Sequence, residues 1–415
     1  MKKLYYPILS IGLLFSACLP SEEFKPTEAN LRTLASYEAD MANSSTKFAL
    51  DLFAQLNKQD EPNQFYSPYS IHQALSMTMN GNEGDVLKEF VNLLRYEGMN
   101  MEDANRGTKE LTEFLLQVDP KVRLAIANAI WYKEGYQVQP PFKQTAREYY
   151  NAEIADLDMY NPNSVNIINN WIAQQTNNLI QDMLDEIPSD AVMYLVNAIY
   201  FKADWKYQFK ASKTKKEPFY PSPGNPVQVD MMDLDGPATF KSYFGQGYQY
   251  FEIPYSTGQY SMGILYDPQG DLDQVSSLLN FENVEMWRRD AQESNFILKM
   301  PKFKLHQKMD NMKGDLMEMG LVRPFSFHPE NFTRLFSNPT GDLKISRVIH
   351  DALIEVDEKG SEAAAATVVE VVELVSTIPS TPAIITLDKP FIFFIQEKHS
   401  GAILFMGKLG DPSKL

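Results

Sequence analysis

Residues 358–378 have the sequence Glu358-Lys359-Gly360-Ser361-Glu362-Ala363-Ala364-Ala365-Ala366-Thr367-Val368-Val369-Glu370-Val371-Val372-Glu373-Leu374-Val375-Ser376-Thr377-Ile378. The four alanines favour a helix, because alanine has the highest intrinsic helix propensity. Five of the eight residues 368–375 are valine, and β-branched side chains favour strands. The stretch contains no proline, so all its backbone N–H groups are available for strand pairing. It is therefore compatible with two conformational states.

An alternating pattern appears when this stretch is treated as a strand, in which successive side chains point to opposite faces. One face would carry Ser361, Ala363, Ala365, Thr367, Val369 and Val371, and the other would carry Glu362 and Glu370. The first face begins with small side chains and is uncharged throughout. Such a strand could enter between existing strands and bury this face while its carboxylates stay in water.

The composition is that of a folded globular protein. Of the 415 residues, 44% are apolar and 12% are aromatic, which is enough for one large α+β domain. The formal charge of -16 argues against nucleic acid as a partner, because phosphate binding needs clustered Lys and Arg, and the acidity is readily explained by solubility. The chain has a single cysteine, Cys18, so it cannot form an intramolecular disulfide.

The hydrophobic pattern predicts helices and strands mixed along one domain. Helices are expected from near Met41, after Ser67-Pro68, and over Val165–Leu184. Strands are expected at Leu124–Tyr132, Val192–Phe201, Tyr260–Tyr266, Phe296–Met300, Ala352–Val356 and Phe391–Gln396. The sequence shows neither a repeat of solenoid length nor a linker dividing this region.

Motifs for enzymatic chemistry are missing from the sequence. We find no G-x-S-x-G, no H-E-x-x-H and no glycine-rich phosphate loop. The five histidines are scattered without metal-ligand spacing, so we expect no metal. We therefore predict that the protein is not an enzyme and needs no cofactor.

Six segments in a fixed order resemble motifs of the serpins, and the resemblance as a whole extends from about Met41 to Pro412. They are Phe65–Ile71, Leu195–Lys202 with Trp205, Phe209 and Thr214, Met300–Phe303, Ile349–Gly360, Pro390–Ile395 and Ile403–Lys408. The resemblance implies an α+β fold with three β-sheets, about nine helices and an exposed reactive loop, in a domain spanning residues 41–415.

The resemblance implies an inhibitor that acts once on each protease molecule. A target endopeptidase attacks the loop and forms a covalent acyl-enzyme. The cut loop then inserts into the large sheet, a known case of strain release by strand insertion. Ser361 and the four alanines after Glu362 favour this inhibitory type over a non-inhibitory carrier or storage serpin. A surface lipoprotein that binds peptides or glycans is the alternative from another class.

The resemblance also assigns roles to particular residues. The hinge of the loop would comprise Glu358, Gly360, Ser361, Ala363, Ala364, Ala365, Ala366 and Thr367. The shutter, a polar group under the large sheet, would comprise Ser67, Ser70, Asn197 and His350. The breach, where insertion starts, would include Trp205 and Lys302, with Lys302 paired to Glu358. Asp351 departs from the basic residue often found beside the shutter histidine.

The spacing between the hinge glycine and the cleaved bond in inhibitory serpins implies cleavage at Leu374–Val375. The chain from Leu374 to Pro390 is longer than usual, so Glu373, Val375 and Thr377 remain alternatives for the residue before the cut.

The residues around this bond suggest the class of target. A leucine suits chymotrypsin-like or subtilisin-like proteases, and the valines suit elastase-like ones. Papain-like cysteine proteases are weaker candidates, and a glutamate-specific enzyme would need Glu370 or Glu373. Residues 361–388 contain neither Arg nor Lys, which argues against trypsin-like targets.

The N-terminus has the pattern of a secretory signal, with Lys2 and Lys3 followed by the apolar run Leu4–Phe15. Phe15-Ser16-Ala17-Cys18 resembles a bacterial lipobox, which implies a signal peptide at 1–17 and a lipid on Cys18. An ordinary cleaved signal is the alternative. Residues 18–40 are then expected to be a tether.

The sorting signals after Cys18 suggest the destination. Leu19 resembles outer-membrane sorting signals, and Ser21-Glu22-Glu23 resembles an export tag of surface lipoproteins, although a periplasm-facing position is also compatible. The region Arg95–Lys109 has no dense basic stripe that would suggest a heparin-type cofactor. We expect a monomer whose partners are target endopeptidases and, through the lipid, a membrane.

Overall fold

The computed structural model describes residues 28–176, 178, 180–188, 191–309, 311–337, 343–361 and 382–415. Within these ranges the α-helices are α1 (Ser36–Leu56), α2 (Pro68–Met79), α3 (Gly84–Leu93), α4 (Met101–Gln117), α5 (Pro140–Tyr150), α6 (Ser164–Gln175), α7 (Leu272–Ser277), α8 (Phe281–Asp290) and α9 (Lys313–Glu318). The strands are β1 (Asn63–Tyr66), β2 (Arg123–Lys133), β3 (Glu153–Leu157), β4 (Met193–Asp204), β5 (Lys215–Ser222), β6 (Asn225–Asp233), β7 (Ala238–Phe244), β8 (Gln249–Pro254), β9 (Tyr260–Tyr266), β10 (Gln292–Pro301), β11 (Phe303–Met309), β12 (Arg347–Val356), β13 (Gly360–Ser361), β14 (Ala383–Thr386), β15 (Phe391–Glu397) and β16 (Ile403–Leu409).

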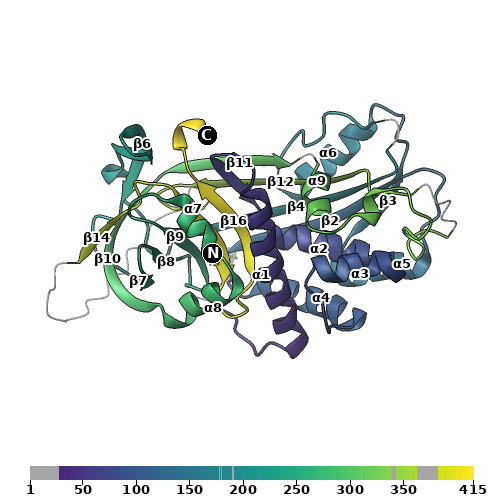
Figure 1. Cartoon of the computed structure of the whole chain (residues 1–415), viewed down its shortest axis with the longest axis horizontal. Coiled ribbons are helices and arrows are strands. Elements are labelled where there is room, and N and C mark those ends of the chain that lie inside the picture. The colour runs from purple at the N-terminus through teal and green to yellow at the C-terminus, as the bar shows by residue number, and fades with distance from the viewer. Residues whose placement is uncertain are drawn as a thin grey trace, which may run out of the picture.

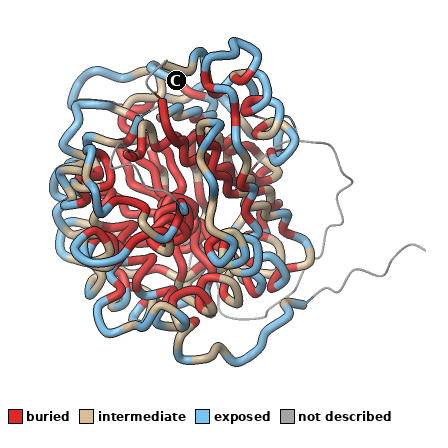
Figure 2. Tube along the Cα trace, turned by 90° about the vertical axis from the view of Figure 1, so that its right-hand side faces the viewer, coloured by how far each residue is buried: buried red, intermediate tan, exposed pale blue. Residues whose placement is uncertain are grey.

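A six-stranded sheet extends along the molecule in the order β11-β12-β13-β4-β2-β3, and β12 also pairs directly with β4 (Figure 1). Its two faces pack against different apolar clusters. Leu195 and Ile199 of β4 belong to the larger cluster, which includes α2, whereas Val196 and Ala198 belong to a second cluster with α6. Buried residues accordingly gather in the middle of the molecule and exposed loops surround them (Figure 2).

The second sheet has ten strands, and β10 holds its two halves together. Residues Gln292–Phe296 of β10 pair with β7, and Lys299–Pro301 pair with β6. The strand β14 adds in parallel to β10. Two of the three sheets implied by the resemblance are therefore hydrogen-bonded to each other within the described residues, while the α+β class is as expected.

The helix expected over Val165–Leu184 is shorter than its apolar pattern suggested, because α6 ends at Gln175. Asn178 has a left-handed backbone, and the Asn169 side chain hydrogen-bonds the backbone N–H and C=O of Leu184, each at 2.8 Å. The α6–β4 connection (residues 180–188) is thereby held in a non-helical form, although Leu184 is buried. Burial against the sheet produced the apolar spacing beyond Gln175.

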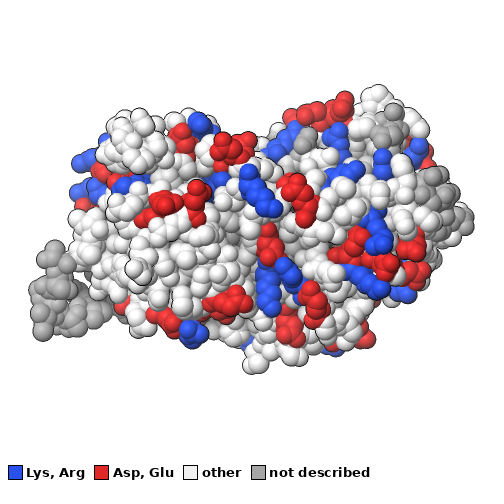
Figure 3. Space-filling view, viewed as in Figure 1, with Lys and Arg blue, Asp and Glu red and all other residues white. Residues whose placement is uncertain are grey.

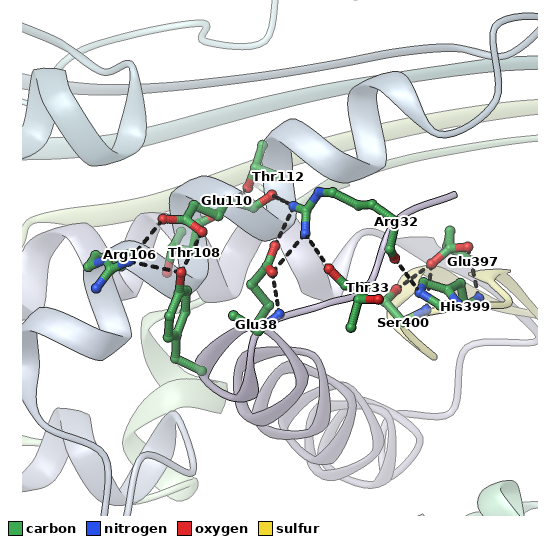
Figure 4. Close-up of polar contacts among 12 residues, drawn as sticks. Arg32, Thr33, Glu38, Arg106, Thr108, Glu110, Thr112, Glu397, His399 and Ser400 are labelled. Atoms are coloured by element: carbon green, nitrogen blue, oxygen red, sulfur yellow. Dashed lines mark hydrogen bonds and ion pairs between the residues drawn. The ribbon is translucent and has the colours of Figure 1, made fainter. Parts of the chain in front are cut away.

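The chain joins the folded body earlier than expected, because α1 begins at Ser36 rather than near Met41. Within the N-terminal segment (residues 30–35), Asn30 donates hydrogen bonds of 2.7 and 2.9 Å to carbonyls at the C-terminal end of α4. Arg32 binds the carboxylate of Glu38, which is 1% exposed and also accepts a hydrogen bond from the backbone N–H of Ala35, the N-cap of α1 (Figure 4). Residues 30–40, which we assigned to the tether, therefore pack on the body.

Surface charges of both signs are interspersed on the face shown in Figure 3. Cations near α4 lie beside carboxylates, as in Arg95–Asp51 at 2.7 Å and Arg106–Glu110 at 3.5 Å. Such exposed pairs contribute only about 0–1 kcal/mol each. Within the described ranges, every helix is too short or too polar to cross a bilayer.

Candidate functional site: the open end of the six-stranded sheet

The short strand β13 lies between β12 and β4 at one end of the six-stranded sheet. Ser361 pairs with Val356 of β12 on one side and with Ala203 of β4 on the other. Both pairings are antiparallel. The first residues of the expected hinge thus already form part of the sheet.

Farther along, β4 and β12 pair directly with each other in parallel, and the last such pair is Ala198 with Asp351. Among the described residues, no pairing joins 199–202 of β4 to 352–355 of β12. Over four residues on each strand, between β13 and the Ala198–Asp351 pair, β4 and β12 are therefore not paired with each other within the described ranges. We call this stretch the open seam.

Gly360 is required where β13 begins. A Cβ atom at this position would lie 2.1 Å from the Ala203 carbonyl oxygen and 2.6 Å from the Asp204 Cα. Asp357 stabilises the approach, because its Oδ1 accepts from the backbone N–H groups of Lys359 at 2.9 Å and Gly360 at 3.1 Å. The chain therefore turns tightly into the sheet.

Trp205 and Tyr255 form a stacked aromatic pair beside β13, with ring centroids 4.3 Å apart. The Trp205 Nε1 donates to the Asp357 carbonyl at 2.9 Å. The Tyr255 hydroxyl is 2.7 Å from the Ser361 Oγ, and burial raises the pKa of Tyr255 well above its usual range. The aromatic pair thus contacts the chain on both sides of Gly360, at Asp357 and at Ser361. Tyr255 was not identified from the sequence, which offers no signal for a contact between residues so far apart.

Lys302 and Glu358 meet at the same end of the sheet. The Lys302 Nζ lies 2.9 Å from the Glu358 carboxylate, which also accepts from Thr214 at 2.7 Å. Burial alone would raise the pKa of Glu358, but the hydrogen bonds from Thr214 and Lys302 lower it. Glu358 is thus held as a carboxylate immediately before the residues that enter the sheet.

The four residues that the resemblance assigns to the shutter come from the start of α2 (Ser67 and Ser70), from β4 (Asn197) and from β12 (His350). The backbone N–H of Ser67 donates to His350 Nε2 at 2.9 Å, and the Ser70 hydroxyl donates to the Ser67 carbonyl at 3.1 Å. Burial lowers the pKa of His350 to about 3, so this ring is neutral. Asn197 is the β4 residue opposite His350 and donates to Asn128 at 2.7 Å.

Two buried atoms of the shutter have no hydrogen-bond partner among the described residues: His350 Nδ1 and Asn197 Oδ1. Buried polar atoms without partners are rare and costly. Asn128 was not identified from the sequence, although a single amide within the apolar run 124–132 was a signal for it.

Several predicted residues lie outside the described ranges. These are the hinge residues Ala363, Ala364, Ala365, Ala366 and Thr367, the bond Leu374–Val375, and Cys18. The described residues contain no group of three or more His, Cys, Asp or Glu side chains that could hold a metal ion. The described part of the site consists of strand edges and buried polar side chains, and its chemistry is that of strand pairing.

Known proteins resemble this chain in sequence and in fold. The family model described as "Serpin (serine protease inhibitor)" matches residues 43–412. An uncharacterized serpin-like protein of Methanosarcina acetivorans is 30% identical over 427 residues, covering 99% of this chain and 98% of the relative. Human Serpin B4 is 32% identical over 394 residues, covering 90% of this chain and 99% of the relative. The crystal structure of human thyroxine-binding globulin has a TM-score of 0.81 and 26% identity, covering 91% of this chain and 100% of the other.

These matches confirm the resemblance and the α+β fold that it implied. Proteins of this group are generally protease inhibitors that form covalent complexes with their targets, and some do not inhibit. Because the family model covers most of the sequence and both relatives align over nearly their whole length, the chain belongs to the serpin family.

Proposed function

We propose that this serpin inhibits serine endopeptidases of elastase-like, chymotrypsin-like or subtilisin-like specificity, and to a lesser extent papain-like cysteine endopeptidases. The protease nucleophile attacks the Leu374 carbonyl, the bond to the Val375 nitrogen breaks, and an acyl-enzyme remains on Leu374. The freed loop then enters the open seam and carries the protease along the sheet. Each molecule is consumed in one reaction, so the chain is not an enzyme and needs no cofactor.

The observation that carries this proposal is the position of β13. Ser361 is paired on both sides, and each further residue would move the pairing by one position along β4 and β12. Ala365 would then face Ile199 and Ala352, which are 4% and 0% exposed. A small side chain fits such a buried position without displacing its neighbours. The residues that the resemblance assigns to the hinge thus suit the environment they would enter.

The same register gives the end of the movement. Gly360 pairs with Asp204, so Val371 would reach Met193, the residue at the other end of β4. Leu374 would then lie three residues beyond that strand. From Gly360 to Leu374 the inserted chain would extend about 46 Å at roughly 3.3 Å per residue. A protease bound to Leu374 would therefore be moved past the far end of β4.

Incubation with pancreatic elastase and with chymotrypsin tests the proposal. We expect a covalent complex that survives denaturing electrophoresis, because insertion outpaces hydrolysis of the acyl-enzyme. As the control, the same protein is incubated with protease whose nucleophile has been blocked. This mixture should give no complex. Cleavage of the loop without any complex would contradict inhibition and favour a non-inhibitory carrier or a binding lipoprotein.

We also propose that Cys18 carries a lipid that holds a monomeric serpin on the outer membrane, with its loop on the cell surface. Support comes from the signal-like residues 1–17 and the small residues before Cys18. Cys18→Ser should move the protein from the membrane fraction to the soluble fraction after expression in a bacterial host. A variant that stays with the membrane would contradict the lipid anchor, and protease treatment of whole cells would report surface exposure.

A further inference from the structure

A row of ion pairs crosses the face of the six-stranded sheet that lies under the α6–β4 connection. The pairs are Lys304–Glu355 at 3.4 Å, His306–Asp351 at 2.7 Å and Lys308–Asp185 at 3.1 Å. The cations of the row are alternate residues of β11 and therefore share one face. In the middle pair the cation is a histidine, the side chain whose charge changes near neutral pH.

The two members of the middle pair differ in exposure. The Asp351 side chain is 1% exposed, and its Oδ2 is buried without a hydrogen-bond partner among the described residues. The His306 side chain is 47% exposed, so it exchanges protons freely with solvent. The hydrogen bond to Asp351 raises the pKa of His306, against the lowering effect of burial. A buried carboxylate thus depends for its neutralisation on a group that titrates in solvent.

Other charged and titratable groups face this pair. They are Lys304 and Lys308 on β11, Arg347 and Glu355 on β12, Tyr194, Tyr200 and Lys202 on β4, and Asp182 and Asp185 in the α6–β4 connection. The two lysines of β11 oppose the charge on His306 and lower its pKa. His350 lies on the opposite face, where it accepts a hydrogen bond from Ser67.

Asp351 occupies a decisive position in the sheet. It forms with Ala198 the last direct pair between β12 and β4, next to the open seam. An inserting strand that has filled the open seam can advance further only if the Ala198–Asp351 pair separates. Any change in the charge balance at Asp351 therefore acts where the sheet has to part.

We propose that the His306–Asp351 pair makes the parting of β4 from β12 pH-dependent, a regulation of the inhibitory loop insertion proposed above. With His306 protonated, the Asp351 charge is compensated and the closed pair is favoured. When His306 loses its proton, the buried carboxylate loses the cation that is hydrogen-bonded to it, which is costly in a dry environment. Parting of the two strands admits water and relieves this cost.

The direction of the effect follows from the raised pKa of His306. The stabilisation from the charged pair is complete below the ordinary histidine pKa of 6.5 and is lost as the pH rises through the higher pKa of the folded protein. Loop insertion should therefore be slower in mildly acidic solution and faster in mildly alkaline solution.

The test uses the intact protein and a synthetic peptide with the sequence of residues 361–374, which can fill the seam without any protease. The N-terminus of the peptide is acetylated because a free α-amino group titrates near pH 8, and the remaining carboxylates stay ionised between pH 6 and pH 9, so its own charge is constant. Incorporation is followed by native electrophoresis at each pH. We expect the rate for the wild type to rise about threefold to tenfold over this interval, because the charged pair stabilises the closed sheet only while His306 is protonated.

Variants separate the pair from its surroundings. Asp351→Asn and His306→Gln should both give a flat pH profile, whereas Lys304→Gln, the matched change in the neighbouring pair, should keep a rising profile, displaced to higher pH because Lys304 no longer lowers the pKa of His306. An unchanged slope in Asp351→Asn, or a flat wild-type profile with normal incorporation, would overturn this inference alone. Failure of the peptide to enter at any pH would overturn strand insertion, and with it both the proposed function and this inference.

Discussion

Replacing Ala365 by arginine should turn the protein from an inhibitor into a substrate. If the pairing register continued beyond Ser361 during insertion, it would place residue 365 on the buried face between Ile199 and Ala352. Burying an unpaired guanidinium there costs on the order of several kcal/mol. Even ~3 kcal/mol added to the insertion barrier slows the step about 100-fold, so hydrolysis of the acyl-enzyme wins. The ratio of complex to cleaved serpin on a denaturing gel measures the outcome.

The neighbouring substitution Ala364→Arg is the matched control. Residue 364 would face Tyr200 and Leu353, which are only half-buried, so its charge can remain in water. We expect this variant to keep forming the complex. Melting temperatures provide a second readout, since the cleaved wild type and cleaved Ala364→Arg should be more heat-stable than their intact forms. Complex formation by Ala365→Arg equal to that of the wild type would contradict the inward position of this residue.

Replacing Leu374 by arginine should change the target class. A chymotrypsin-like pocket is apolar and rejects a charged side chain, whereas a trypsin-like pocket carries a carboxylate that binds it. We expect the association rate constant with chymotrypsin to fall by at least about two orders of magnitude, and a covalent complex with trypsin to appear. Progress curves with chromogenic substrates measure both rate constants.

The substitution Val375→Arg controls for the position of the cut. It carries the same charge one residue later, so trypsin would cleave after residue 375 and a longer segment would have to insert. We expect a larger share of cleaved serpin than with Leu374→Arg. In the wild type, mass spectrometry of the released C-terminal fragment should show Val375 as its first residue. A fragment with another first residue, or an unchanged reaction of Leu374→Arg with chymotrypsin, would show that the cleaved bond lies at a neighbouring position.

The features visible in the sequence were those that repeat with a strand period or occur as short motifs. Alternation along 361–371 predicted that Ser361 points inward, and Ser361 is 1% exposed. The breach pair could be inferred from the resemblance, and Lys302 lies 2.9 Å from Glu358. Both depend on local patterns that survive without knowledge of the rest of the fold.

Contacts between distant segments could not be inferred in this way. The partner of Ser361 is Tyr255, which is 106 residues earlier in the chain and reaches it only because the six-stranded and ten-stranded sheets meet at this end. His306 and Asp351 are 45 residues apart and look unremarkable as single residues. The start of α1 was missed for another reason, since Glu38 is a charged residue whose burial depends on Arg32.

Because residues 30–35 pack on the folded body, only the residues before them can act as a tether to a membrane. If Cys18 is lipidated, only the eleven residues 19–29 separate it from Asn30, which makes the first hydrogen bond to the end of α4. A chain of that length spans at most about 40 Å. The folded domain would then stay within a layer next to the membrane that is scarcely thicker than the bilayer itself. Within that layer its effective concentration would greatly exceed its bulk value, so proteases approaching the membrane would meet it first.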